Sequence, residues 1–283
     1  MKRNTMFATV LGGIAALSLV PVMSESANAS SLTSSWNYQY DAVGDGSGGK
    51  AYDIKGMAMS IQGDKLVVAL MGGTKLSGEM YNKTNISWGD MFFNFSGKSF
   101  KEAEAAGQLY GVRFAQSNDT KVDLGVYSGV KTTSVTGSNY GYSSLESYYK
   151  AGFDKANTQG TALSTKQAAY DYYGKGSIQN SIASGNKVGG VDILAMNDLL
   201  GLGLNFTGKT TSDSIFGFSV DKNSLGSGNF LANIFLECGN DAMAFSASAA
   251  PEPTTMAGTA LGIAAFGALK RRRRQKQTAE KAD

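Results

Sequence analysis

Short apolar segments alternate with glycine turns over residues 30–250, and this pattern predicts a domain made mainly of β-strands. The segment WNYQYDA places Trp36, Tyr38 and Tyr40 on one face, which is the two-residue period of a half-buried strand. The next segment, AYDIKGMAMSIQGDKLVVALMGG, predicts two strands joined through a Gly-Asp turn.

Further strands are predicted along the rest of this region. They are ISWGDMFFNFSG (86–97), LYGVRFA (109–115), KVDLGVYSGVKTTSV (121–135), SIFGFSV (214–220), GNFLANIFLE (228–237) and DAMAFSA (241–247). Strands at this spacing are typical of a β-sandwich or jelly-roll-like fold.

Three short helices are predicted from capping boxes, in which a Ser hydroxyl and a Glu or Gln side chain satisfy the free amides at a helix start. The boxes begin at Ser99, Ser143 and Ser164. The last two lie in a tyrosine-rich segment, 139–190, which we interpret as an insertion over one edge of the sheet. The fold class is therefore a single, mainly β domain with a few short helices.

The N-terminus has the pattern of a secretory signal peptide. A basic pair, Lys2-Arg3, precedes the mostly apolar run 6–20, and Ala27 and Ala29 are the small residues of a cleavage site. Removal of residues 1–29 is predicted; the alternative is an uncleaved N-terminal anchor.

Charge is distributed unevenly between the ends and the body. The chain has 26 Lys+Arg and 23 Asp+Glu. Segment 1–29 holds two basic residues and one acidic residue, and segment 251–283 holds seven basic and three acidic residues. The body, 30–250, therefore has 17 basic and 19 acidic residues. Because a basic face is what neutralises phosphates, we expect no nucleic-acid partner.

Histidine is absent from the sequence, and Cys238 is the only cysteine. These counts exclude a Ser-His-Asp triad, a Cys-His pair, a His-based zinc site and an internal disulfide. We therefore expect no enzyme, although a carboxylate pair acting as a glycoside hydrolase stays a remote alternative because any Asp and Glu can meet in a fold.

The C-terminal segment APEPTTMAGTALGIAAFGALKRRRRQKQ combines three features. These are Pro251-Glu252-Pro253, a small-residue apolar run over 254–269, and a basic block of Lys270, Arg271, Arg272, Arg273 and Arg274. The run would span about 24 Å as a helix at about 1.5 Å per residue, so it predicts a short transmembrane helix. The basic block predicts that the tail after it, 276–283, stays in the cytoplasm.

This tripartite tail, 251–275, resembles a PEP-CTERM sorting signal. The resemblance implies that Pro251, Glu252 and Pro253 are recognised by an exosortase, that 254–269 is a transient span of the inner membrane, and that the basic block is its stop. It also implies a surface or extracellular-matrix protein of a Gram-negative bacterium that makes exopolysaccharide. The alternative is a plain single-span anchor.

The body resembles cyanobacterial exosortase-dependent surface proteins in the segments YDAVGDG, ISWGDMFFNFSG and FLECGNDAMA. Together the two resemblances imply an exported protein with a structural or adhesive role, processed by signal peptidase and exosortase and associated with exopolysaccharide. They place the precursor transiently in the inner membrane and the mature protein at the cell surface or outside the cell.

Acidic residues near both ends of the body form a candidate calcium site. The first and last strands of a sandwich often run side by side, which would bring together Asp41, Asp45, Glu237, Asn240 and Asp241. Oxygen ligands of this kind suit Ca²⁺, although an EF-hand is excluded by Val43 and Tyr52 at its third and twelfth positions. The alternative is that these residues form ordinary polar turns without a cofactor.

Aromatic residues give the alternative function of a carbohydrate-binding domain. Trp36, Tyr38, Tyr40 and Trp88 would form one stacking platform, unless they are core residues. A tyrosine cluster in the polar insertion would form another, unless it packs the insertion against the sheet. Its members are Tyr140, Tyr142, Tyr148, Tyr149, Tyr170, Tyr172 and Tyr173.

Overall fold

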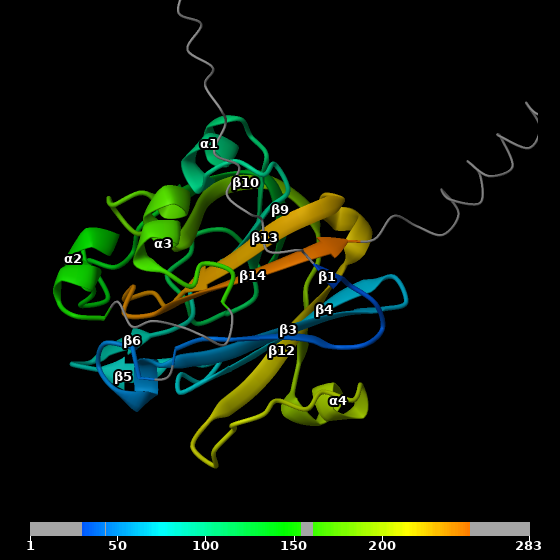
Figure 1. Ribbon diagram of the computed structural model, residues 1–283, viewed down its shortest axis with the longest axis horizontal. Helices are drawn as coiled ribbons and strands as arrows, with labels where there is room; N and C mark the ends of the chain where they lie inside the picture. Colours follow the sequence, from blue (N-terminus) through cyan, green and yellow to red (C-terminus); the bar gives the residue numbers. More distant parts are fainter. Residues whose placement is uncertain (1–29, 43, 154–160, 250–283) are drawn as a thin grey trace, which may run out of the picture.

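Strands in several sheets, with a few short helices, make up the part of the chain that a computed structural model describes, residues 30–42, 44–153 and 161–249 (Figure 1). The prediction of a mainly β protein is therefore confirmed. The larger sheet has seven strands, in the spatial order β1 (Ser30–Ser31), β14 (Ala242–Ala249), β13 (Gly228–Phe235), β7 (Met91–Asn94), β8 (Leu109–Arg113), β9 (Gly125–Thr133) and β10 (Ser181–Gly189). Its strands pair antiparallel except β1, which runs parallel to β14.

The second sheet has five strands, and a separate hairpin and several helices decorate the two sheets. The five strands, in spatial order, are β11 (Asp192–Leu194), β12 (Ser214–Asp221), β4 (Lys65–Gly72), β3 (Ile54–Gln62) and β2 (Asn37–Tyr40). The hairpin consists of β5 (Glu79–Tyr81) and β6 (Thr84–Ile86). The helices are α1 (Phe100–Ala105), α2 (Leu145–Lys150), α3 (Lys166–Tyr173), α4 (Met196–Gly201) and the 3₁₀ turns η1 (Lys50–Tyr52) and η2 (Lys222–Ser224).

The main core lies between the two large sheets, which face each other across it (Figure 1). Each sheet contributes alternate residues of its strands, because successive side chains of a strand point to opposite faces. Those on the five-stranded sheet include Met57, Met59, Val68, Leu70 and Phe218, and those on the seven-stranded sheet include Phe93, Val112, Ile234 and Phe245.

The five-stranded sheet is also covered on its outer face. There Val67, Ala69 and Met71 of β4 pack against Leu199 of α4 and against Phe206. Burial on both faces explains why β4 is a continuous apolar run rather than an alternation.

The outer face of the seven-stranded sheet carries the other helices. Phe100 of α1 packs on Phe92, with their ring centroids 5.4 Å apart. Tyr173 of α3 packs edge-on against Phe235 of β13 at 5.0 Å, and α2 belongs to the same cluster. The helices of the predicted insertion thus pack on the outer face of this sheet rather than over an edge, and its last part, β10, is itself an edge strand.

Several boundaries differ from the sequence prediction. The segment 86–97 is not one strand: β6 ends at Ile86, an isolated bridge joins Trp88 to Leu236, and β7 comes after it. The capping box at Ser99 is present, whereas α2 and α3 begin one residue later than predicted, with caps at Ser144 and Thr165. The hairpin β5–β6, strands β1, β10 and β11 and helix α4 were not predicted.

The predicted signal peptide (1–29) and the PEP-CTERM-like tail (251–283) lie outside the described residues. Within the part of the chain that the structure describes, no helix has the length and apolar character needed to cross a membrane.

Candidate functional site

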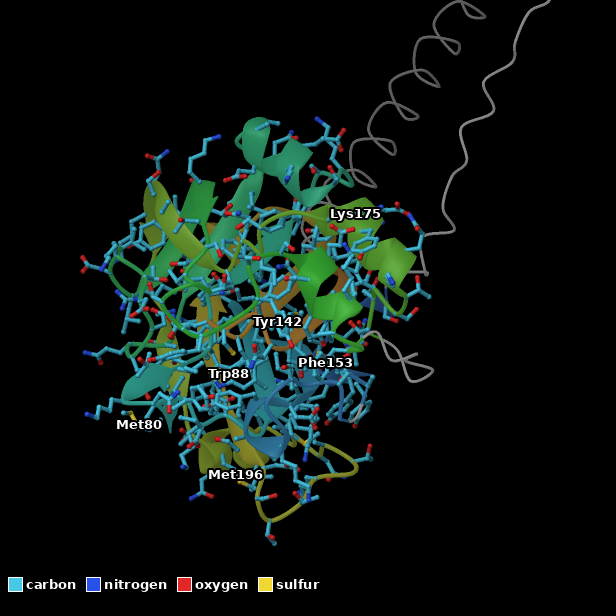
Figure 2. The ribbon with its side chains drawn as sticks, turned by 90° about the vertical axis from the view of Figure 1, so that its left-hand side faces the viewer. Met80, Trp88, Tyr142, Phe153, Lys175 and Met196 are labelled. Carbon is cyan, nitrogen blue, oxygen red and sulfur yellow. The ribbon has the colours of Figure 1, made fainter. Side chains whose placement is uncertain are left out.

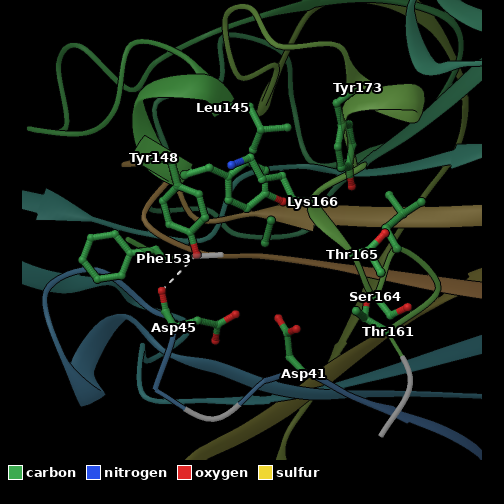
Figure 3. Close-up of a pocket in the computed structure, with 13 residues that line it drawn as sticks. Asp41, Asp45, Leu145, Tyr148, Phe153, Thr161, Ser164, Thr165, Lys166 and Tyr173 are labelled. Atoms are coloured by element: carbon green, nitrogen blue, oxygen red, sulfur yellow. Dashed lines mark hydrogen bonds between the residues drawn. The ribbon is translucent and has the colours of Figure 1, made fainter. Parts of the chain in front are cut away.

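Three buried aspartates meet where the end of β2 lies beside the start of β14. Asp41 directly follows β2, Asp45 lies in the next loop, and Asp241 directly precedes β14. One carboxylate oxygen from each lies within 4.8 Å of those of the other two. Their exposed fractions are 6%, 8% and 1%, and the carboxylates of Asp41 and Asp45 point toward one another (Figure 3). We refer to these three residues as the acidic cluster.

The loop that carries Asp45 is held by a fourth aspartate outside the cluster. Asp53 Oδ1 accepts hydrogen bonds from the backbone amides of Gly44, at 2.9 Å, and Gly46, at 3.4 Å. Gly46 approaches the neighbouring backbone so closely that a Cβ atom on it would lie 2.3 Å from Tyr52 O. Because only glycine permits this approach, Gly46 sets the path that brings Asp45 to the cluster.

Burial and neighbouring charges perturb the carboxyl group of Asp241. Its Oδ2 accepts a hydrogen bond from Ile54 N at 2.6 Å, and its Oδ1 accepts one from Ala242 N at 2.8 Å. Burial raises the pKa of Asp241 well above its ordinary value, and the nearby carboxylates of Asp41 and Asp45 raise it further, while the two backbone hydrogen bonds oppose the shift. The cluster therefore favours a bound proton or a bound cation over three ionised carboxylates side by side.

A cavity of about 50 Å³ adjoins Asp41 and Asp45, and tyrosines of α2 and α3 line it. Tyr148 Oη donates a hydrogen bond to Asp45 O at 2.9 Å. The hydroxyl of Tyr173 is buried, points into the same space and makes no hydrogen bond with any described residue (Figure 3). Since a site for one water needs about 10–15 Å³, the cavity has room for a cation with accompanying water.

The donor set of this site consists of oxygen atoms alone. Ca²⁺ binds six to eight oxygens at about 2.3–2.6 Å, so two ligands on opposite sides of the ion lie about 5 Å apart. The spacing within the acidic cluster is compatible with one such ion. Lys166 is the one positively charged residue among the described residues lining the cavity, and its Nζ lies 5.9 Å from the ring centroid of Tyr149.

The other two predicted calcium ligands lie elsewhere. Glu237 accepts hydrogen bonds from the backbone amides of Ser87, at 2.9 Å, and Asp119. Asn240 Nδ2 donates to Ser47 O at 2.7 Å. The structure thus brings together Asp41, Asp45 and Asp241 of the five, and the tyrosines beside them were not anticipated as part of this site.

Glu237 and Asp90 are buried carboxylates outside the acidic cluster. Burial raises the pKa of Glu237 to about 7 and the pKa of Asp90 to about 6. Asp90 accepts hydrogen bonds from Thr120 Oγ1 at 2.6 Å, Ile182 N at 2.7 Å and Asn118 Nδ2 at 2.9 Å. Among the described residues, neither carboxylate belongs to a group of three acidic side chains close enough to share an ion, and donors of the protein itself engage them, so both act as internal braces.

The first predicted aromatic platform is not formed. Trp88 is fully buried in the main core (Figure 2), where its Nε1 donates to Thr74 O at 3.0 Å. Trp36, Tyr38 and Tyr40 lie on the other face of the five-stranded sheet, half-buried against Phe206 and the rest of its cluster. The four rings therefore do not share a surface.

The tyrosine cluster of the insertion serves mainly to pack α2 and α3 on the sheet. Tyr148 is buried, and Tyr149, Tyr172 and Tyr173 are half-buried in apolar clusters with it or beside it. Tyr140 differs, because 57% of it is exposed.

No family model, curated protein or solved structure matches this chain. Its function therefore has to be inferred from its own residues.

Proposed function

We propose that this chain is an exported, non-enzymatic protein with a structural or adhesive role at the cell surface or in an exopolysaccharide matrix. Its signal peptide, 1–29, directs export, and an exosortase processes the tail 251–275 while 254–269 holds the precursor in the inner membrane. The body, 30–250, is a single β-sandwich domain that a calcium ion completes at the acidic cluster.

The positions of the outermost described strands support the predicted processing. β1 begins at Ser30, directly after the predicted signal-peptide cleavage site, and β14 ends at Ala249, two residues before the Pro-Glu-Pro motif. Loss of both end segments would therefore remove no described strand.

The convergence of Asp41, Asp45 and Asp241 is the observation that carries the calcium proposal. Burying a carboxylate costs several kcal/mol unless a compensating charge is near, and here three meet within 4.8 Å. Ca²⁺ brings two positive charges to such a cluster and tolerates irregular oxygen ligation. The hydroxyl of Tyr173, which has no hydrogen-bond partner among the described residues, adds a buried polar atom that water on the ion would satisfy.

In an exported protein, a bound calcium ion would stabilise the fold. Cys238 is buried and alone, so no internal disulfide can stabilise the exported domain. Extracellular calcium modules bind with Kd of about 10⁻⁴–10⁻³ M, so such a site fills outside the cell and stays empty in the cytoplasm. Because metal binding adds to folding free energy, calcium would take the place of the missing cross-link.

Thermal unfolding of the full-length chain tests the calcium site. At a calcium concentration 100 times Kd, binding should add about 2.7 kcal/mol to the free energy of unfolding relative to EDTA. Asp45→Asn should lose most of this increment. It should also be no less stable than the wild type in EDTA, because one repelling charge is gone.

Asp213→Asn is the matched control, because Asp213 has a buried carboxylate that pairs with Lys55 and is not a member of the cluster. This variant should unfold at a lower temperature in either buffer and keep the full calcium increment. An unchanged melting temperature of the wild type on adding calcium, with no binding heat by calorimetry, would refute the calcium site.

The intact mass and location of the mature protein test the export proposal separately. Loss of 1–29 and of the tail, with the body on the cell surface or in the medium, is expected. A protein that keeps 254–283 in the inner membrane would instead be a tethered domain with a simple anchor.

A further inference from the structure

A groove of about 400 Å³ lies next to the acidic cluster, and we propose that it binds a neutral carbohydrate chain. Its volume is within the about 300–1,000 Å³ range of ligand pockets. Tyr81, Asn139, Tyr140 and Asn240 line it, together with Ser47 and others, and none of the described lining residues carries a charge.

Two exposed tyrosine rings form the rim of the groove. Tyr81 is 48% exposed and Tyr140 is 57% exposed, and their ring centroids are 5.4 Å apart at an interplanar angle of 77°. Tyrosine presents a flat apolar face together with a polar hydroxyl, which matches the apolar faces and peripheral hydroxyls of a pyranose. One ring can stack on a sugar while the other contacts its edge.

Both rings are held by unusual backbone geometry. Tyr140 has φ +54°, and Asn82 and Lys83, which follow Tyr81, have φ +44° and +69°. Two such residues between paired strands form a tight hairpin turn, which fixes Tyr81 at the end of β5. A tyrosine at positive φ stores about 1–3 kcal/mol of strain, a feature that recurs at ligand sites.

The groove also contains an unsatisfied buried acceptor. Asn139 is fully buried, and its Nδ2 donates to Asp119 Oδ2 at 2.9 Å and to Val135 O at 3.0 Å. Its Oδ1 accepts no hydrogen bond from any described residue. Since a buried acceptor left without a donor costs about 1–3 kcal/mol, a hydroxyl entering from the groove would relieve this cost.

The chemistry of the lining selects the ligand class. Amide, hydroxyl and aromatic groups offer donors, acceptors and stacking faces, which suit the hydroxyls and ring faces of an uncharged sugar. Uronic acids or sulfated sugars would lack a cationic partner among the described lining residues, and the body carries a net charge of −2. The partner is therefore a neutral segment of polysaccharide.

The test uses the full-length chain, purified in a detergent without a sugar headgroup. The polysaccharide secreted by the producing cells is separated by anion exchange into a neutral and an acidic fraction, and each is titrated against the immobilised protein. We expect the neutral fraction to bind. Tyr81→Ala and Tyr140→Ala should each weaken binding about tenfold, because they remove a stacking ring.

Met80→Ala is the matched control. Met80 precedes Tyr81 in β5, is 66% exposed and projects at the edge of the molecule without lining the groove (Figure 2). It should bind like the wild type, and circular dichroism should show all three variants folded. Binding of the acidic fraction alone, binding of neither fraction, or equal binding by the tyrosine variants would overturn the proposal. None of these outcomes bears on calcium-dependent melting.

Discussion

Ser47 and Asn240 are joined by two hydrogen bonds, although 193 positions separate them in the chain. Ser47 N donates to Asn240 O at 2.9 Å, and Asn240 Nδ2 donates to Ser47 O at 2.7 Å. Both residues line the groove, and each is near a member of the acidic cluster: Asp45 is two residues before Ser47, and Asp241 directly follows Asn240. The two proposed sites therefore share their walls.

Calcium and the neutral polysaccharide should consequently strengthen each other's binding. An ion at the acidic cluster would fix the two segments that also form the groove, so the polysaccharide would bind an already ordered surface. Coupling of this kind is typically about 5–150-fold. Titrations of the neutral fraction in calcium and in EDTA measure it, and equal affinities in the two buffers would show that the sites are independent.

Asn240→Ala should weaken the coupling between calcium binding and polysaccharide binding. It removes the side-chain hydrogen bond to Ser47 O, which is worth about 1 kcal/mol, and leaves the backbone bond in place. Urea unfolding should show that loss, and the coupling between calcium and polysaccharide should shrink. Asn85→Ala is the control, because it removes a similar bond, to Ser77 O at 3.0 Å, away from the acidic cluster. A variant at Asn240 that keeps full coupling would contradict the shared-wall argument.

The free energy of unfolding should fall as the pH rises from about 4.5 to about 7 in EDTA. Burial raises the pKa of Glu237 to about 7, so the folded state holds this proton more tightly than the unfolded chain does. The stability that the bound proton provides is present at low pH and is lost as the carboxyl ionises in the folded state. Asp90, with its pKa raised to about 6, acts in the same direction.

Glu237→Gln should reduce this pH dependence and leave the part that Asp90 contributes. A pKa displaced from 4.5 to about 7 corresponds to a change on the order of 3 kcal/mol across that range, and a side chain that cannot ionise lacks it. Urea unfolding of both proteins at pH 4.5, 6 and 8 gives the comparison. Parallel pH profiles for the variant and the wild type would mean that Glu237 ionises normally.

Gly46→Ala should disturb the acidic cluster through the backbone. Its Cβ would lie 2.3 Å from Tyr52 O, so the loop must move, at a cost on the order of 1–3 kcal/mol typical of overpacking. The calcium increment in thermal unfolding should fall as Asp45 shifts. Gly190→Ala is the control, because a Cβ there has no heavy atom within 4 Å. It should leave the free energy of unfolding and the calcium increment unchanged. A normal calcium response in Gly46→Ala would mean that this glycine does not position Asp45.

Much of the fold could be predicted because its buried strands carry a clear pattern. Tyr38 and Tyr40 do share one face of β2, Trp36 just before it packs in the same cluster, and the two strands joined near Gly63 are β3 and β4. The capping box at Ser99 likewise forms as expected. These signals are local, so the sequence contains them directly.

The strands that were not predicted include two, β10 and β11, that bury few side chains. β10 is mostly exposed beyond its first two residues, and two of the three residues of β11 are exposed, so neither needs an apolar alternation. Each is held by backbone pairing with a neighbour, β9 or β12, and the identity of that neighbour is set by the topology.

Three of the five predicted calcium ligands could be predicted from the sequence, and the rest of the site could not. Asp41, Asp45 and Asp241 do come together, but the expected pairing of their strands is absent: β2 pairs with β3 in one sheet and β14 with β13 and β1 in the other, so the aspartates meet between the two sheets. Asn240 lies in the bend before β14, where its side chain is held instead by the hydrogen bond to Ser47 O. The position of Tyr173 beside the acidic cluster could not be predicted, because it depends on how α3 packs on the sheet.

The parallel pairing of β1 with β14 also determines how the body would be displayed. Ser30 pairs with Ala247, so both ends of the described body leave from the same corner of the molecule. The acidic cluster and the groove lie at the opposite end of β14, beside the β5–β6 hairpin (Figure 1). β14 has eight residues and spans roughly 23 Å at about 3.3 Å per residue. A body held to the envelope through its C-terminus would therefore point both sites outward, toward the surrounding matrix.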